Sequence, residues 1–130
     1  MVQKPTSITV FHQYETLVPV FPGLGRFIEV VGLMRDVSVS GGEAHSETHT
    51  CQVGPVLRRD DCMGASCLPS IAKVESRTAT PAQCVIESGE ALWTEDAGRV
   101  ELRVRLWSAG APADVEILFS VDTRLGGAAG

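Results

Sequence analysis

The sequence predicts an all-β protein: a single domain over residues 1–130, folded as an antiparallel β-sandwich or jelly roll of about seven to eight strands with a long central loop. Apolar and polar residues alternate in several short runs, which is the pattern of half-buried strands. Turn residues, mainly glycine and proline, recur between these runs. Only 5% of the residues are aromatic, so the core must consist mostly of Val, Leu, Ile and Ala, which favours thin packing between sheets.

The clearest alternation lies near the C-terminus. Two alternating runs are separated by a short break, Ser108–Ala113, that contains glycine and proline. We expect the runs to pair as an antiparallel hairpin over residues 99–124, with Leu106 opposite Val115 and, on the outer face, Arg105 opposite Glu116. The apolar residues that this hairpin would bury are Val100, Leu102, Val104 and Leu106 in the first run and Val115, Ile117, Phe119 and Val121 in the second.

Two long strands are expected in the first third of the chain. The first covers Thr6–Val20 and ends near Pro19, because proline cannot donate to a strand ladder. After a turn at residues 22–25, the second covers Arg26–Ser40 and carries apolar residues on both parities. This pattern predicts a strand that is covered on both faces, or one with a bulge near Gly32.

The middle of the chain is predicted to hold shorter elements. A strand at Glu43–Val53 precedes residues 54–69, which contain prolines and adjacent charges and are expected to form a long irregular loop. Loops of this length are usually functional or take part in assembly. Short elements follow: a strand at Ser70–Thr78, a strand at Ala82–Glu87, a hairpin turn at Ser88-Gly89, a strand at Glu90–Trp93 and a turn at Thr94–Gly98.

The composition argues against two classes of partner. The formal net charge is −5, with acidic residues spread along the chain, whereas nucleic-acid binding needs a basic face. No run approaches the roughly 20 apolar residues of a membrane span. Residues 1–7 lack the apolar core and the cleavage site of a signal peptide, so we expect synthesis and first folding in a cytoplasm.

Four cysteines lie around the expected loop, at Cys51, Cys62, Cys67 and Cys84. They can form disulfides, remain thiols or bind a metal, and the sequence leaves these states open. In a zinc site, His45, His49 and Cys51 would share one parity of an extended strand, with Cys62 and Cys67 near in sequence. The spacing matches no familiar zinc pattern, so we favour a solvated polar strand and expect no metal or other cofactor.

Three sets of residues are candidates for contacts between subunits. The first is a dense charge cluster on the expected loop, formed by Arg58, Arg59, Asp60 and Asp61. In the second set, Trp107 and Leu118 lie on the expected outer face of the hairpin, and two large residues on one outer face indicate a second layer or a partner surface. The third is the tail 125–130, in which Leu125 alone can pack, and which we expect a neighbouring subunit to hold.

No catalytic constellation stands out in the sequence. The stretch Gly64-Ala65-Ser66-Cys67-Leu68 begins like a nucleophile elbow but lacks the last glycine. We therefore expect a non-enzymatic structural or assembly protein whose partners are other protein subunits, in a homo-oligomer or a larger scaffold. Its most specific form is a virion component, such as a capsid decoration or tail protein. The alternatives are a metal- or ligand-binding domain that uses His45, His49 and Cys51, and a small enzyme.

Overall fold

The computed structural model describes residues 7–19 and 24–125 of the chain. Nearly all of these residues lie in seven long strands, and a short 3-10 helix, η1 (Arg59–Asp61), lies between the third and fourth. The strands are β1 (Ser7–Pro19), β2 (Leu24–Val39), β3 (Gly42–Val53), β4 (Cys62–Ser76), β5 (Ala82–Thr94), β6 (Arg99–Gly110) and β7 (Ala113–Leu125).

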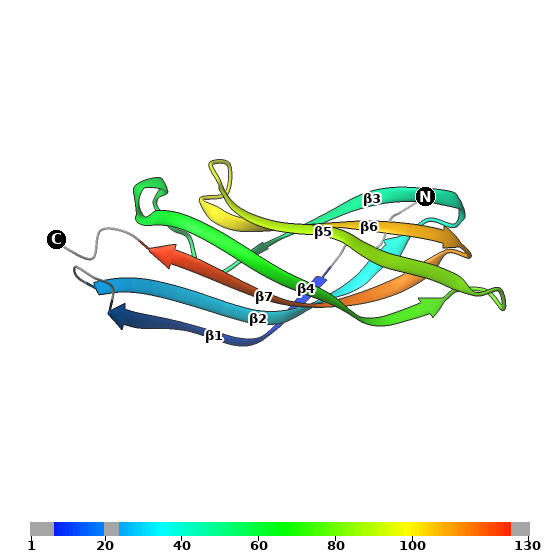
Figure 1. The fold of residues 1–130 in the computed structure, drawn as a ribbon, viewed down its shortest axis with the longest axis horizontal. Coiled ribbons are helices and arrows are strands. Elements are labelled where there is room, and N and C mark those ends of the chain that lie inside the picture. The colour runs from blue at the N-terminus through cyan, green and yellow to red at the C-terminus, as the bar shows by residue number, and fades with distance from the viewer. Residues whose placement is uncertain (1–6, 20–23, 126–130) are drawn as a thin grey trace.

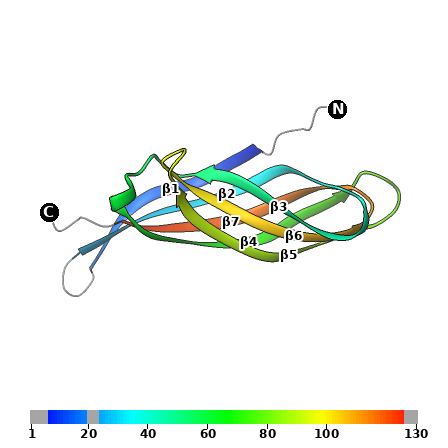
Figure 2. The ribbon, with the colours of Figure 1, turned by 90° about the horizontal axis from the view of Figure 1, so that it is seen from above.

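The strands form two antiparallel sheets that pack face to face as two layers (Figure 1). The four-stranded sheet has the order β1-β2-β7-β4, and the three-stranded sheet has the order β3-β6-β5. The view from above shows the strands of both layers running along the long axis of the molecule (Figure 2). This arrangement confirms the predicted all-β sandwich, while the jelly-roll alternative stays a prediction.

The two C-terminal runs do not form the predicted hairpin. β6 lies between β3 and β5 in the three-stranded sheet, whereas β7 lies between β2 and β4 in the other sheet. The alternation itself is correct, because all eight apolar residues of the two runs are buried in one core. The two rows therefore meet across the sandwich instead of side by side, and the predicted pairs Leu106–Val115 and Arg105–Glu116 are wrong.

The connection between β6 and β7 explains the difference. It consists of Ala111 and Pro112, and it follows Gly110, whose φ is +93°. The amide of Ala111 donates to the carbonyl of Pro81 at 3.3 Å, and the carbonyl of Pro112 accepts from the amide of Arg77 at 2.9 Å. These backbone groups thus bond to the neighbouring β4–β5 connection at the same end of the sandwich (Figure 1), and the chain passes from one sheet to the other.

A bulge in β2 accounts for its apolar residues on both parities. The buried residues of β2 have even numbers up to Met34 and odd numbers from Val37 onward, because the register against β7 shifts between these two. Asp36 lies within the shift with a φ of +57°, a value that Asp adopts more readily than most residues. The sequence predicts the bulge near Gly32, and the structure places it a few residues further along β2.

The predicted long loop over residues 54–69 is wrong in its second half. The irregular segment ends at η1, and β4 begins at Cys62 and continues through Pro69. Proline is tolerated there because β4 is an outer strand that pairs with β7 on one side only. The first half of the loop is held against the β5–β6 turn, where the amide of Leu57 donates to the carbonyl of Gly98 at 2.7 Å.

β5 is a single continuous strand, so the hairpin predicted at Ser88-Gly89 is also wrong. A register shift between Ile86 and Ser88 absorbs the irregularity. Gly89 lies against Pro69 of β4, and a Cβ atom built on this glycine would lie 2.6 Å from Pro69 Cγ. The glycine thus allows the outer strands of the two sheets to approach each other, and the chain turns only at Thr94–Gly98, as predicted.

Candidate functional site

Each of the four outer strands carries a feature that hinders pairing with another chain. β4 and β5 run side by side along one side of the sandwich; β4 contains Pro69, and β5 has a register shift between Ile86 and Ser88. On the other side, β3 turns His45 and Glu47 toward the buried side of β6. β1 is interrupted by a register shift between Val10 and His12. Association is therefore expected to use the outer faces of the sheets, and these two faces differ.

The outer face of the four-stranded sheet carries four apolar side chains in two adjacent cross-strand rows. We use the name apolar band for Val31 and Leu33 of β2, Leu118 of β7 and Leu68 of β4. Leu33 lies directly opposite Leu118, and Leu68 lies one row further along. Leu68 is 76% exposed and Leu118 is 41% exposed. Neighbouring apolar side chains that stay exposed on a folded surface mark interaction sites.

Charged rows border the apolar band at both ends. At one end, Arg35 Nε lies 3.7 Å from Glu116 Oε1, and Lys73 is the cross-strand neighbour of Glu116 on the other side. At the other end, Glu29 lies opposite Asp122. Partial burial and the nearby carboxyl group of Glu29 raise the pKa of Asp122. In the first row, Lys73 Nζ also lies 3.3 Å from Glu75 Oε2, whereas the second row carries two carboxyl groups.

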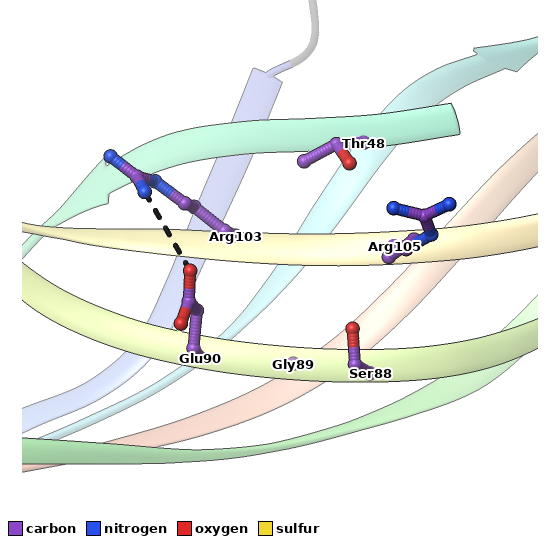
Figure 3. A pocket seen from close by; sticks show the side chains of 6 residues that line it. All are labelled: Thr48, Ser88, Gly89, Glu90, Arg103 and Arg105. Atoms are coloured by element: carbon purple, nitrogen blue, oxygen red, sulfur yellow. Dashed lines mark ion pairs between the residues drawn. The ribbon is translucent and has the colours of Figure 1, made fainter. Parts of the chain in front are cut away.

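The outer face of the three-stranded sheet is mostly polar, apart from the row that contains Val85 and Trp107, and it contains an open hollow of about 280 Å³ (Figure 3). Arg103 Nε lies 2.6 Å from Glu101 Oε2, and Arg103 Nη1 lies 3.6 Å from Glu90 Oε1. Arg105 Nε lies 3.5 Å from Glu87 Oε1. Both arginines of the hollow already face carboxylates, so little positive charge is left for an anionic ligand. The lining residues are Thr48, Ser88, Gly89, Glu90, Arg103 and Arg105.

Trp107 and Leu118 do not share an outer face, which corrects the sequence prediction. Trp107 lies on the three-stranded sheet, in a row with Ser46 and Val85, and is half-buried. Leu118 lies on the opposite side of the molecule, on the four-stranded sheet. The prediction failed because it placed β6 and β7 in one sheet.

The predicted zinc ligands come from strands of different sheets. His45, His49 and Cys51 line the inward side of β3, whereas Cys62 and Cys67 lie on β4. Among the residues that the structure describes, no three His, Cys, Asp or Glu side chains are arranged to hold a metal ion. The sequence order alone had suggested that they lie close together.

The two histidines of β3 have different surroundings inside this strand. His45 Nδ1 lies 2.8 Å from the carbonyl oxygen of Glu43, and Nε2 lies 3.1 Å from Glu47 Oε2; these contacts raise the pKa of His45. Glu47 also accepts a hydrogen bond from the amide of Ser40 at 3.0 Å. Burial lowers the pKa of His49, and its Nε2 has no hydrogen-bond partner among the described residues. The strand is therefore only partly solvated.

The four cysteines are free thiols, and all are half-buried. Burial raises the pKa of Cys51 to about 11, and it also raises the pKa of Cys67 and of Cys84. Reactive cysteines have the opposite property, a lowered pKa that favours the thiolate. The thiols of these three residues are protonated at neutral pH.

The predicted charge cluster lies at the end of the sandwich where β3 leads into β4. Arg58, Arg59 and Asp60 are exposed there, on η1 and the residue before it. The side chains of Asp61 and Leu125, and all of residues 126–130, lie outside the part of the chain that the structure describes. The charge cluster and the tail stay predicted contact sites.

Sequence reasoning identifies Leu118 but misses the other members of the apolar band. Leu68 falls within the predicted loop, so its face is not assigned. Val31 and Leu33 share an odd parity, but the bulge in β2 mixes them with the buried odd residues that follow. Reading the parity separately on the two sides of the bulge would have placed both on an outer face.

Comparisons with known proteins identify no relative: no family model, curated protein or solved structure matches the chain. Within residues 7–19 and 24–125, no helix has the length and apolar character that a bilayer crossing requires. The function therefore has to be inferred from the surfaces of the chain itself.

Proposed function

We propose that the protein is a non-enzymatic assembly subunit that binds other protein subunits through the outer face of its four-stranded sheet. The observation that carries the proposal is the apolar band, in which Leu118 of the inner strand β7 and Leu68 of the edge strand β4 stay exposed. Charged rows lie on both sides of the band. An apolar centre with a polar rim is the usual composition of a protein–protein interface.

The other surfaces support this choice by being less suited to association. The outer strands carry Pro69, inward-facing His45 and Glu47, or a register shift, and such features hinder strand addition. The outer face of the three-stranded sheet presents paired charges around Arg103 and Arg105. Exposed ion pairs contribute little to affinity because water screens them.

The environments of the histidine and cysteine side chains favour binding over catalysis. Both ring nitrogens of His45 contact groups on its own strand, the carbonyl of Glu43 and the carboxylate of Glu47. The thiols of Cys51, Cys67 and Cys84 have raised pKa values. An activated nucleophile needs a base within hydrogen-bonding reach or a lowered pKa, and neither accompanies these groups.

A virion component, such as a capsid decoration or tail protein, is one setting in which an assembly subunit of this kind would work. The metal- or ligand-binding alternative, which uses His45, His49 and Cys51 of β3, has less support, because no three His, Cys, Asp or Glu side chains among the described residues are arranged to hold a metal ion.

Sedimentation of the protein in extracts of its native source tests the proposal. Wild type is expected in complexes of at least twice its own mass of 13.9 kDa. The double variant Leu68→Ser/Leu118→Ser removes the two exposed members of the apolar band, and it is expected to sediment as a folded monomer. Val85→Ser is the matched control, since Val85 is 55% exposed on the opposite face. Equal sedimentation of the wild type, the double variant and the control would contradict the proposal.

A further inference from the structure

We propose that the apolar band binds a second copy of this chain. In this dimer, which rests on the proposed function, the two four-stranded sheets pack face to face with their strands reversed. A two-fold axis runs across the strands over the row formed by Gly32 and Phe119, which are cross-strand neighbours. Sheets that pack in this way keep their strand directions within about 30° of one another.

The outer residues of β2 are self-complementary about this axis. Going along the strand, they are an acid, two apolar residues and a base: Glu29, Val31, Leu33 and Arg35. Glu29 and Arg35 lie three residues before and after Gly32. Reversing the strand therefore places Arg35 of one copy over Glu29 of the second copy, and it does so twice because of the symmetry. Val31 of each copy then faces Leu33 of the other.

The same reversal fits large side chains against small ones on β7 and β4. Leu118 of one copy faces Ser120 of the second, and Leu68 faces Ser70. Alternating large and small residues across an interface allows the two faces to interdigitate. Each exposed leucine of the apolar band thereby covers a serine of the other copy.

The charged rows also match across the axis. The row of Arg35, Glu116 and Lys73, in which Lys73 also pairs with Glu75, lies over the carboxyl pair of Glu29 and Asp122 in the second copy. Glu116 faces Asp122 in this arrangement, but Arg35 and Lys73 flank Glu116 on both sides. Complementary potentials of this kind fix the orientation of an interface more than they add affinity.

The available area is sufficient for a stable dimer. The strands of the sheet are 13 to 16 residues long. Four strands spaced about 4.8 Å apart, with roughly 13 residues at about 3.3 Å each, present a face of roughly 800 Å². This is about the area that each partner buries in an interface of standard size. A second copy can thus cover the face, including the apolar band on β2, β7 and β4.

Analytical ultracentrifugation of the purified chain, over a hundredfold range of concentration, tests the inference. Wild type is expected to pass from 13.9 kDa to twice that mass, about 28 kDa. The variants Arg35→Glu and Glu29→Arg each convert two attractive contacts into repulsive ones, so each alone should weaken the dimer at least about tenfold. Arg105→Glu, on the outer face of the other sheet, should dimerise like wild type.

Mixing the two charge variants gives the sharpest result. In an equimolar mixture, the acid introduced at position 35 of one chain meets the base introduced at position 29 of the other. The native pair of Arg35 with Glu29 forms at the symmetry-related position. The mixture should therefore dimerise where neither variant does alone. Melting curves of both variants confirm that they are folded before this comparison.

Two results would overturn the inference: a wild-type chain that stays monomeric over the whole range, or a mixture that dimerises no better than its components. The proposed function is tested separately, by sedimentation of native extracts. If purified wild type is monomeric while large complexes in native extracts still require Leu68 and Leu118, the partner is a different protein and the assembly role stands.

Discussion

The indole Nε1 of Trp93 donates a hydrogen bond of 2.9 Å to the backbone carbonyl of Leu57. The amide of Leu57 also donates to the carbonyl of Gly98. Leu57 is thus bonded on both sides, and the segment between β3 and η1 is fixed to the β5–β6 turn. These two hydrogen bonds explain why residues 54–58 are not the free loop that the sequence predicts.

Removing this bond should loosen the segment without unfolding the sandwich. Trp93→Phe leaves the carbonyl of Leu57 without its indole donor, and we expect a loss of about 1–2 kcal/mol in the free energy of unfolding. Hydrogen exchange of the Leu57 amide should become faster. Trp107→Phe is the control, because no described residue bonds to its indole. Equal losses in the two variants would contradict the role assigned to Trp93.

Gly32 is required by the packing of the four-stranded sheet. A Cβ atom at this position would lie 2.7 Å from the carbonyl oxygen of Thr9 and 2.8 Å from Phe119 Cζ. Gly32→Ala should therefore lower the free energy of unfolding in urea by about 1–3 kcal/mol, because the ring of Phe119 and the strand β1 must both move. Gly64→Ala on β4, where a Cβ meets nothing within 4 Å, should leave stability nearly unchanged.

The contributions of the two β3 histidines to the free energy of unfolding should change with pH in opposite directions. The pKa of His45 is raised above 6.5 by its contacts with Glu43 and Glu47, so its contribution is full below pH 6.5 and is lost as the pH rises through the folded-state pKa. The pKa of His49 is lowered by burial, so its contribution is full above pH 6.5 and is lost as the pH falls toward the folded-state pKa.

Melting temperatures of His45→Gln and His49→Gln, measured between about pH 5 and pH 8, separate the two effects. The difference between wild type and His45→Gln should shrink as the pH rises. The difference between wild type and His49→Gln should shrink as the pH falls. Parallel curves for wild type and both variants would show that neither histidine is coupled to folding.

The thiols should be slow to react in the folded protein. Burial raises the pKa of Cys51 to about 11, so very little thiolate is present at neutral pH. Alkylation of Cys51 by iodoacetamide should therefore accelerate strongly on unfolding. All four cysteines should titrate in the unfolded chain without reductant, since they are free thiols. Fewer than four thiols under these conditions would indicate a disulfide.

The pattern of side chains predicts burial in this protein better than it predicts strand pairing. Val104 and Ile117 are both buried, as their parity requires, but the strands that carry them lie in different sheets. Period-2 alternation determines which face a residue occupies, whereas the neighbour of a strand depends on the connection. Here the connection at Pro112 bonds to the β4–β5 connection, and no local signal in β6 or β7 reveals this.

The positions of proline and glycine mislead a sequence-based prediction for a related reason. The sequence predicts a loop at Pro69 and a turn at Gly89, yet both lie inside strands and in contact with each other. Proline fits because β4 pairs on one side only, and glycine fits because the two outer strands approach closely. Both reasons are tertiary. The apolar band escapes prediction for the same reason. Leu68 can be assigned to an outer face only if β4 is a strand, and the sequence predicts a loop there.

Photo-crosslinking from position 118 tests the central claim most directly. Leu118 is replaced with a photoreactive phenylalanine analogue in the protein of the native source, and Val85 is replaced in a control. The account predicts that position 118 crosslinks to protein partners in high yield, while position 85 on the opposite face does not. Equal yields at the two positions, or crosslinks from position 85 alone, would contradict assembly through the apolar band.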